Sequence, residues 1–235
     1  MSSSPHILST RKLTSDKVIE WQAKGWKFTS HDFISKVIDI PADLNPHAIH
    51  KHVVLTSMTG VKAFIQIINQ RQLDVSAYDV YCISRGTKEY ALASGLNIKS
   101  TALHASALAD EILKDVEVKE VTHVSSNLRR NELSEKLINA GVVVHNVITY
   151  STEFTPVAID HSYDAIIFFS PSAVDSFISL NMVQQVPCFC IGKTTADHAE
   201  KQGYQHTFIA EAPSEEILLK TIITHYSKTP AHAKE

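Results

Sequence analysis

The sequence of 235 residues predicts an α/β protein with two similar domains, each built on a parallel sheet. Strand-like and helix-like segments alternate along the chain, which is the pattern of parallel sheets wound with helices. One strand–turn–helix segment occurs twice, because VVLTSMTGVKAFI at 53–65 aligns with IIFFSPSAVDSFI at 166–178. A second pair follows at 81–95 and 189–203, where Cys, Ile, Thr, Ala and Gly recur in order. A unit present twice indicates two similar domains that face a shared cleft.

The predicted strands are short and rich in β-branched or aromatic residues. YDAIIFFS at 163–170 is almost continuously apolar, as expected for a parallel strand that helices cover on both faces. We expect strands, in chain order, at 6–9, 26–29, 36–40, 53–56, 79–84, 121–125, 142–148, 164–170, 187–191 and 205–209.

The predicted helices lie between these strands. Four of the helix-like segments end at a glycine, which is typical of a left-handed helix C-cap: Gly25, Gly95, Gly141 and Gly203. We expect helices at 13–24, 59–70, 88–94, 105–114, 129–140, 172–180, 194–202 and 214–226.

Two extended, β-prone segments interrupt this alternation, at 29–40 and 145–157. We interpret them as a pair of linkers through which the chain leaves one domain and later returns to it. Domain one then comprises residues 1–33 and 152–235, and domain two is inserted in it as residues 34–151. Paired linkers of this kind would form a hinge.

The composition is that of a globular protein, with 44% hydrophobic and 20% charged residues. No apolar run reaches the ~18 residues that span a bilayer, and the first residues lack the apolar segment of a signal peptide. We therefore expect a cytoplasmic protein without a membrane partner. The net charge of −3, with Lys and Arg scattered, argues against a nucleic-acid partner.

The cysteines and histidines do not predict a disulfide framework or a metal centre. Three cysteines is an odd number, and Cys188 and Cys190 are expected to face the same side of a buried strand. His47, His50 and His52 form the one cluster among 13 histidines. A metal site there is the alternative, but no Cys or carboxylate completes a ligand set nearby in the sequence. We expect a solvated loop that enters a strand, and no metal.

Small polar residues, in place of glycine-rich cofactor motifs, open several helices. The chain has no G-x-G-x-x-G and no P-loop, so we expect no nicotinamide, flavin or nucleotide cofactor. Any one of the polar turns is explained by N-capping. Several in equivalent places favour an anion-binding cleft, because open α/β sheets bind ligands at the carboxyl ends of strands and helix N-termini attract anions. These turns lie at 56–60, 125–127, 170–172 and 192–195.

This ordered set of motifs resembles the uroporphyrinogen-III synthase family over nearly the whole chain. The I-G-x-T-T-A block within CIGKTTADHAEKQG is the most specific of them. The segments that carry the resemblance are STRK at 9–12, TSMTGVKAF at 56–64, ISRGTKEYALASG at 83–95, 125–152, FFSPSAVDSF at 168–177, 190–203 and AEAPSEEILLKTI at 210–222.

The resemblance implies two flavodoxin-like parallel-sheet domains joined by a two-stranded linker, one inserted in the other. It also implies a cytoplasmic, monomeric, cofactor-free lyase of tetrapyrrole (haem or sirohaem) synthesis. The small-molecule substrate would be hydroxymethylbilane, which carries eight carboxylates. The product would be uroporphyrinogen III, formed by cyclisation with inversion of ring D and loss of water.

The resemblance also implies roles for individual residues. Tyr150 matches the cleft tyrosine of the family, whose phenol would donate a hydrogen bond or a proton to the departing hydroxyl. An aromatic residue that only packs the linker is the alternative. Substrate carboxylates would be bound by Ser57, Thr59, Thr87, Ser125, Asn127, Ser170, Ser172, Thr194 and Thr195.

The chain departs from the family pattern at several of these turns. Met58 and Thr59 stand where Pro–Arg is frequent, so one carboxylate contact is lost or supplied elsewhere. Lys193 replaces a frequent proline and adds a cation, and Ser84 replaces a glycine. Ser125 with Ser126 occupies a turn that usually carries a glycine.

Two other functions compete with this hypothesis. A non-catalytic two-lobed protein that binds a small anionic ligand would share the hinge and the hydroxyl-rich turns. A signalling domain like a response regulator is disfavoured, because residues 7–10, at the end of the first predicted strand, contain no acidic cluster.

Overall fold

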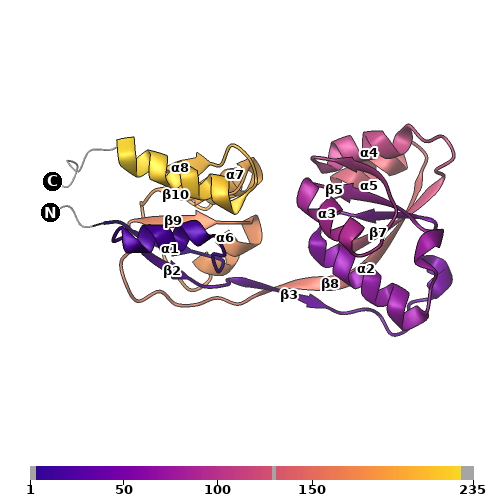
Figure 1. The fold of residues 1–235 in the computed structure, drawn as a ribbon, viewed down its shortest axis with the longest axis horizontal. Coiled ribbons are helices and arrows are strands. Elements are labelled where there is room, and N and C mark those ends of the chain that lie inside the picture. The colour runs from indigo at the N-terminus through magenta and orange to yellow at the C-terminus, as the bar shows by residue number, and fades with distance from the viewer. Residues whose placement is uncertain (1–3, 129–130, 229–235) are drawn as a thin grey trace. The chain divides into compact units, whose positions relative to one another are not determined.

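The computed structural model describes residues 4–128 and 131–228. Contacts divide the chain into two units (Figure 1), of which unit 1 comprises Met1–Ser35 with Glu153–Glu235 and unit 2 comprises Lys36–Thr152. Each unit is built around one sheet with helices on both faces. The predicted fold class, two parallel-sheet α/β domains of which one is inserted in the other, is confirmed.

Unit 1 has a sheet in which every strand pairs in parallel with its neighbours. Its elements are β1 (His6–Ser9), α1 (Asp16–Ala23), β2 (Lys27–Ser30), β9 (Ala165–Phe168), α6 (Pro171–Ile178), β10 (Cys188–Cys190), α7 (Lys193–Lys201), β11 (Thr207–Ile209) and α8 (Glu215–Lys228). The strand order is β11-β10-β9-β1-β2. Ile166 and Phe168 pack with α6 and α7, whereas Ala165 and Ile167 pack with α1 and α8. Helices therefore bury both faces, which explains why β9 is apolar throughout.

Unit 2 repeats this construction. Its elements are the 3-10 turns η1 (Pro46–Ala48) and η2 (Val75–Ala77), with β4 (His52–Leu55), α2 (Met58–Arg71), β5 (Asp79–Ile83), α3 (Arg85–Ala93), β6 (Ile98–Ala102), α4 (Ala105–Leu113), β7 (Glu120–Ser126) and α5 (Glu132–Asn139). Val53 and Leu55 of β4 pack with α2 and α3, while Val54 packs with α4 and α5. The core therefore lies on both sides of the sheet.

Two strands connect the units. β3 (Ile34–Ile38) and β8 (Val143–Phe154) pair with each other, so the second sheet has the order β3-β8-β7-β4-β5-β6. The amide of Asp39 donates to the carbonyl of Thr149, and the amide of Thr155 donates to the carbonyl of Phe33, both at 2.9 Å. These bonds show that β3 and β8 run antiparallel. They lie in the two segments that the sequence predicts as paired linkers.

Most predicted elements match observed ones. Each predicted helix corresponds to an observed one, although residues 129 and 130 of the predicted helix 129–140 lie outside the described residues. The four expected C-cap glycines all have positive φ, between 81° and 102°. β6 is not among the predicted strands, and it is an edge strand that pairs with β5. Its sequence, IKSTA, is half exposed and lacks the apolar run by which buried strands are recognised.

The paired cysteines behave as expected for residues of a buried strand. Cys188 and Cys190 are fully buried, and their sulfur atoms lie 3.7 Å apart on one face of β10. Their mutual hydrogen bond and burial hold the pKa of the Cys188 thiol well above its ordinary range. A thiol that stays protonated is a poor nucleophile, so this pair is part of the core.

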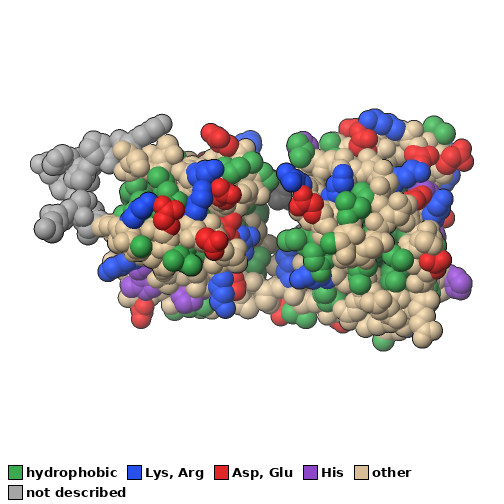
Figure 2. Space-filling model, in the orientation of Figure 1, with side chains coloured by type: hydrophobic (Ala, Val, Ile, Leu, Met, Phe, Trp, Pro, Cys, Tyr) green, Lys and Arg blue, Asp and Glu red, His purple; other side chains and the backbone are tan. Residues whose placement is uncertain are grey.

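The surface carries charges of both signs. On the face seen in Figure 2, Lys and Arg side chains are interspersed with Asp and Glu over both units. Among the described helices, none is both long and apolar enough to cross a bilayer.

We predict that acid weakens the fold through three partly buried histidines, His6, His52 and His225. Burial lowers the pKa of each below 6.5. As pH falls through about 6.5, the unfolded chain therefore binds protons that the folded chain does not, and the free energy of unfolding decreases. We expect a lower urea midpoint at about pH 5.5 than at about pH 7.5, with a smaller difference in His52→Gln. Equal midpoints would contradict this assignment.

Candidate functional site

Most of the predicted site residues of unit 2 lie where strands end and helices begin. Parallel strands bring their carboxyl ends to the same edge of a sheet, which is where open α/β sheets bind ligands. We call this set the unit 2 rim: Ser57, Thr59, Ser84, Thr87, Ser125, Asn127 and Tyr150.

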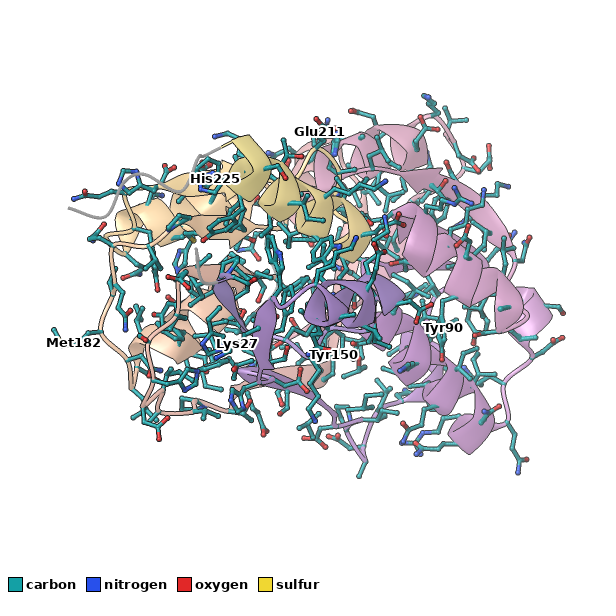
Figure 3. All side chains as sticks on the ribbon, turned by 60° about the vertical axis from the view of Figure 1, so that its left-hand side comes forward. Lys27, Tyr90, Tyr150, Met182, Glu211 and His225 are labelled. Atoms are coloured by element: carbon teal, nitrogen blue, oxygen red, sulfur yellow. The ribbon has the colours of Figure 1, made fainter. Side chains whose placement is uncertain are left out.

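Ser57 and Tyr150 form the central contact of this rim. Ser57 is the N-cap of α2, and its Oγ accepts a hydrogen bond from the amide of Gly60 at 3.0 Å. The same Oγ lies 2.8 Å from the phenol oxygen of Tyr150, which projects from β8 (Figure 3). The Tyr150 side chain is 5% exposed and packs in the core beneath α2. The fold thus holds this phenol against a helix N-terminus.

Gly60, in the first turn of α2, lies beside this pair. A Cβ atom at Gly60 would lie 3.4 Å from the carbonyl oxygen of Val124 and 3.6 Å from the Oγ of Ser57. It would also lie 3.9 Å from Cε1 of Tyr150. These are ordinary van der Waals distances, so the first turn of α2 lies in contact with the phenol and the end of β7.

Ser125 and Asn127 stand at the end of β7 in different environments. The Oγ of Ser125 is buried and has no hydrogen-bond partner in the part of the chain that the structure describes. The backbone amide of Asn127 donates to the carbonyl of Tyr150 at 3.2 Å. The side-chain Oδ1 of Asn127 accepts from the amide of Thr152 at 3.1 Å. Asn127 is therefore engaged in fastening β7 to β8.

The next turn along the sheet joins β5 to α3. The Oγ of Ser84, the N-cap of α3, lies 3.4 Å from the amide of Thr87 and 3.2 Å from its hydroxyl. Thr87 is 4% exposed, whereas Thr59, in the first turn of α2, is half exposed. The hydroxyl of Thr87 therefore braces its own turn, and that of Thr59 is accessible.

Unit 1 has the equivalent turns, which we call the unit 1 rim: Thr10, Ser170, Ser172, Thr194 and Thr195. Ser170 caps α6 as Ser57 caps α2, since its Oγ accepts from the amide of Ala173 at 3.2 Å. Ser172 is half exposed and Thr194 is exposed. Thr195 is 4% exposed, as is Thr87 at the matching place in the other copy. The repeat in the sequence is therefore also a repeat of the caps at Ser57 and Ser170 and of the burial of Thr87 and Thr195.

A residue to which the sequence analysis assigned no role, Arg11, lies beside the unit 1 rim. Its guanidinium carbon is 3.7 Å from the ring centre of Phe169, next to Ser170, and it pairs with Glu215 at 2.7 Å. The one signal for it was its place in STRK, directly after β1. Lys193, by contrast, pairs with Asp197 at 2.8 Å on α7. Its positive charge is therefore partly offset.

The helices that start at the repeated turns lack acidic residues in their first turns. This holds for α2, α3, α6 and α7. Of the other described helices, α1, α5 and α8 contain Asp or Glu in their first turns, and α4 does not. Acidic residues at a helix N-terminus stabilise the helix, so their absence at the four repeated turns leaves the positive ends of those helices available to another anion.

A separate cavity of about 400 Å³ lies between β6 and the end of α4, away from these turns. Burial and two nearby carboxylates raise the pKa of Tyr81 in its wall to about 12. The cavity contains none of the predicted site residues. Its lining is Tyr81, Lys99, Ser100, Glu111, Lys114, Asp115 and Val116.

A family model matches most of the chain, and solved structures share its fold. The family model described as "Uroporphyrinogen-III synthase HemD" matches residues 30–220. Two solved structures share the fold: uroporphyrinogen-III synthetase from Helicobacter pylori 26695, at 16% identity and a TM-score of 0.70, and a mutant uroporphyrinogen III synthase from the bacterium Thermus thermophilus, at 12% identity and 0.69. The alignments cover 94% of this chain and 99% of the first, and 96% of this chain and 100% of the second. A comparison with curated protein sequences found no match.

We predict that Ser84→Gly stabilises unit 2. Ser84 has φ 68° and ψ 154°, a region that glycine adopts and other residues reach only with strain of about 1–3 kcal/mol. Loss of a serine cap to glycine costs only a few tenths of a kcal/mol, and the added backbone freedom costs about 0.5–1 kcal/mol. We expect the free energy of unfolding, measured by thermal denaturation, to rise by about 1 kcal/mol. Ser84→Ala keeps the strain and loses the cap, so it should destabilise, and a gain in that control would refute the explanation.

Proposed function

Because the chain belongs to the uroporphyrinogen-III synthase family, we propose that it cyclises hydroxymethylbilane to uroporphyrinogen III with inversion of ring D and loss of water. The coarser activity, a cyclising lyase of tetrapyrrole synthesis, follows from the family itself. The observation that carries the finer proposal is the contact between Ser57 and Tyr150 at a helix N-terminus. The proposed catalytic residue is Tyr150, and the rims of the two units bind the substrate carboxylates.

The hydrogen bonds at Ser57 support a directed role for the phenol. A serine hydroxyl has one proton to donate and two lone pairs with which to accept. The Oγ of Ser57 already accepts from the amide of Gly60, so its proton is available to the phenol oxygen of Tyr150. The phenol proton is then free to point at the departing hydroxyl of the substrate. This chain of donors also stabilises negative charge that develops on the phenol as it gives up its proton.

The step that this proton assists is the loss of the substrate hydroxyl as water. The carbon left behind is an azafulvenium-type electrophile. The terminal ring attacks it through its already substituted carbon, which gives a spiro intermediate that fragments and recloses with the ring inverted. Without an enzyme the bilane closes without inversion, so much of the catalysis consists of holding the substrate in the productive conformation.

The rims supply hydrogen-bond donors for the carboxylates of the substrate, although the protein has no positive net charge. The protein has a net charge of −3, so attraction must be local. Helix N-termini that lack acidic residues present amide N–H groups and hydroxyls, which bind anions. Arg11, whose charge is partly offset by Glu215, lies next to Ser170 in unit 1.

The competing function, a non-catalytic binder of a small anion, is disfavoured by the family match over residues 30–220. Incubation with hydroxymethylbilane separates the two functions. An enzyme yields the type III isomer, whereas a binder leaves only the type I isomer that forms spontaneously.

We predict that Tyr150→Phe lowers kcat for type III formation by about 100-fold, the size of a typical general-acid contribution. The substitution removes only the hydroxyl, so the cap between Ser57 and Gly60 and the packing of the ring remain. The measurement is chromatography of the type III and type I products after oxidation to porphyrins. Circular dichroism checks that the variant is folded, and unchanged turnover would remove Tyr150 from the mechanism.

We further predict that Thr59→Glu raises KM for hydroxymethylbilane by about tenfold while it raises the melting temperature. A carboxylate in the first turn stabilises α2 by about 0.3–1 kcal/mol, but it occupies the helix N-terminus that the substrate would use. Thr59→Gln is the matched control, because it has the same size without the charge. If Thr59→Glu leaves KM unchanged, the start of α2 does not bind a carboxylate.

A further inference from the structure

Two histidines and a glutamate meet at the amino ends of three strands of unit 2, at the end of the sheet opposite the rim. Nδ1 of His50 lies 3.1 Å from one carboxylate oxygen of Glu120, and Nε2 of His145 lies 3.1 Å from the other. The two imidazole rings are stacked with their centres 4.0 Å apart. All the candidate ligand atoms lie within 4.8 Å of one another. Among the described residues this set brings two imidazole nitrogens and a carboxylate oxygen close enough together to share one metal ion.

The sheet holds these three residues in place. Glu120 and Thr122 are two residues apart in β7, so they share one face of the sheet. His145 of β8 is the register partner of Thr122. The hydroxyl of Thr122 accepts from the amide of His50 at 2.8 Å, which fixes the backbone just before β4. Glu120 and His145 therefore project from two neighbouring strands, β7 and β8, and His50 lies two residues before β4, where its amide bonds to Thr122.

The distances suit a small divalent ion. In a tetrahedral zinc site with metal–nitrogen bonds of about 2.0–2.1 Å, ligand atoms stand about 3.3–3.4 Å apart. The 3.1 Å contacts of Glu120 are close to that spacing, so modest side-chain rotation admits a metal. The side chains of His50, Glu120 and His145 are 23%, 48% and 38% exposed, which leaves an entry path and room for a water ligand.

We propose that His50, Glu120 and His145 form a binding site for a divalent transition-metal ion, of which Zn²⁺ is the best fit. Two imidazoles with one carboxylate favour zinc, cobalt, nickel or copper over magnesium or calcium, which prefer oxygen ligands. The bound ion joins the entry of β4 to β7 and β8 and so stabilises unit 2. This inference is independent of the proposed function, because the site lies away from Tyr150 and the rim.

The sequence predicts no metal site at His47, His50 and His52, because no Cys or carboxylate lies nearby in the chain. The structure places only His50 of these three in the set. His52 lies instead within reach of Asp79 and Tyr81, and the missing carboxylate comes from a strand far along the chain.

The test is titration of the full-length protein with Zn²⁺ in isothermal calorimetry, with the visible absorption of Co²⁺ as a report on coordination. We expect one equivalent to bind. We expect His145→Gln and Glu120→Gln each to weaken binding by at least about tenfold, because each removes a ligand. A saturating excess of Zn²⁺ should raise the melting temperature of the unaltered protein by about 5 °C and raise that of His145→Gln by clearly less.

His47→Gln is the matched control, because it removes an exposed histidine from the same sequence cluster and leaves the set intact. Binding by this variant should equal that of the unaltered protein, and circular dichroism shows that all variants are folded. The proposal is overturned if Zn²⁺ does not bind more tightly than about 1 mM, or if His145→Gln binds it equally well. In that case the three side chains form only a carboxylate bridge between two imidazoles.

Discussion

The capping hydrogen bond at the end of the first strand of each repeat is the interaction on which the arrangement of both rims depends. Ser57 and Ser170 each accept from the amide three residues further on, with backbone angles that agree within about 10°. Such a cap fixes where the helix starts relative to the strand that precedes it. In unit 2 the same oxygen also contacts Tyr150. The hydroxyl of Ser57 thus both caps α2 and positions the phenol of the proposed catalytic residue.

This construction would explain how a protein with a net charge of −3 binds the proposed polyanionic substrate. A helix N-terminus acts over a short range and is strongest within the first turn. Each unit places two such termini at repeated turns, without acidic residues to compete with the ligand. Charge of both signs elsewhere on the surface (Figure 2) then matters little for binding. Recognition by fixed amides and hydroxyls also suits a reaction in which the folding of the substrate decides the product.

β8 has an unusual place in this design. Its first half pairs in parallel with β7 inside the sheet of unit 2, and its second half pairs with β3 where the chain passes between the units. His145 stands in the first half and Tyr150 in the second, five residues further along. An ion at the amino end of the sheet would therefore steady the same strand that carries the phenol, through the backbone and without touching the rim.

The sequence by itself determined the features that depend on near neighbours along the chain. Alternating strands and helices, the C-cap glycines, the duplicated turns and the burial of Cys188 and Cys190 all follow from spacing and residue type. β6 could not be predicted in this way, because a half-exposed edge strand lacks the apolar pattern of a buried strand. Only the tertiary structure brought Ser57 to Tyr150, and His50 to Glu120 and His145, since these contacts join strands whose order in the sheet differs from their order in the chain. Which strand lies beside which is decided by the burial of both faces of the sheet, a property of the whole unit that no local pattern contains.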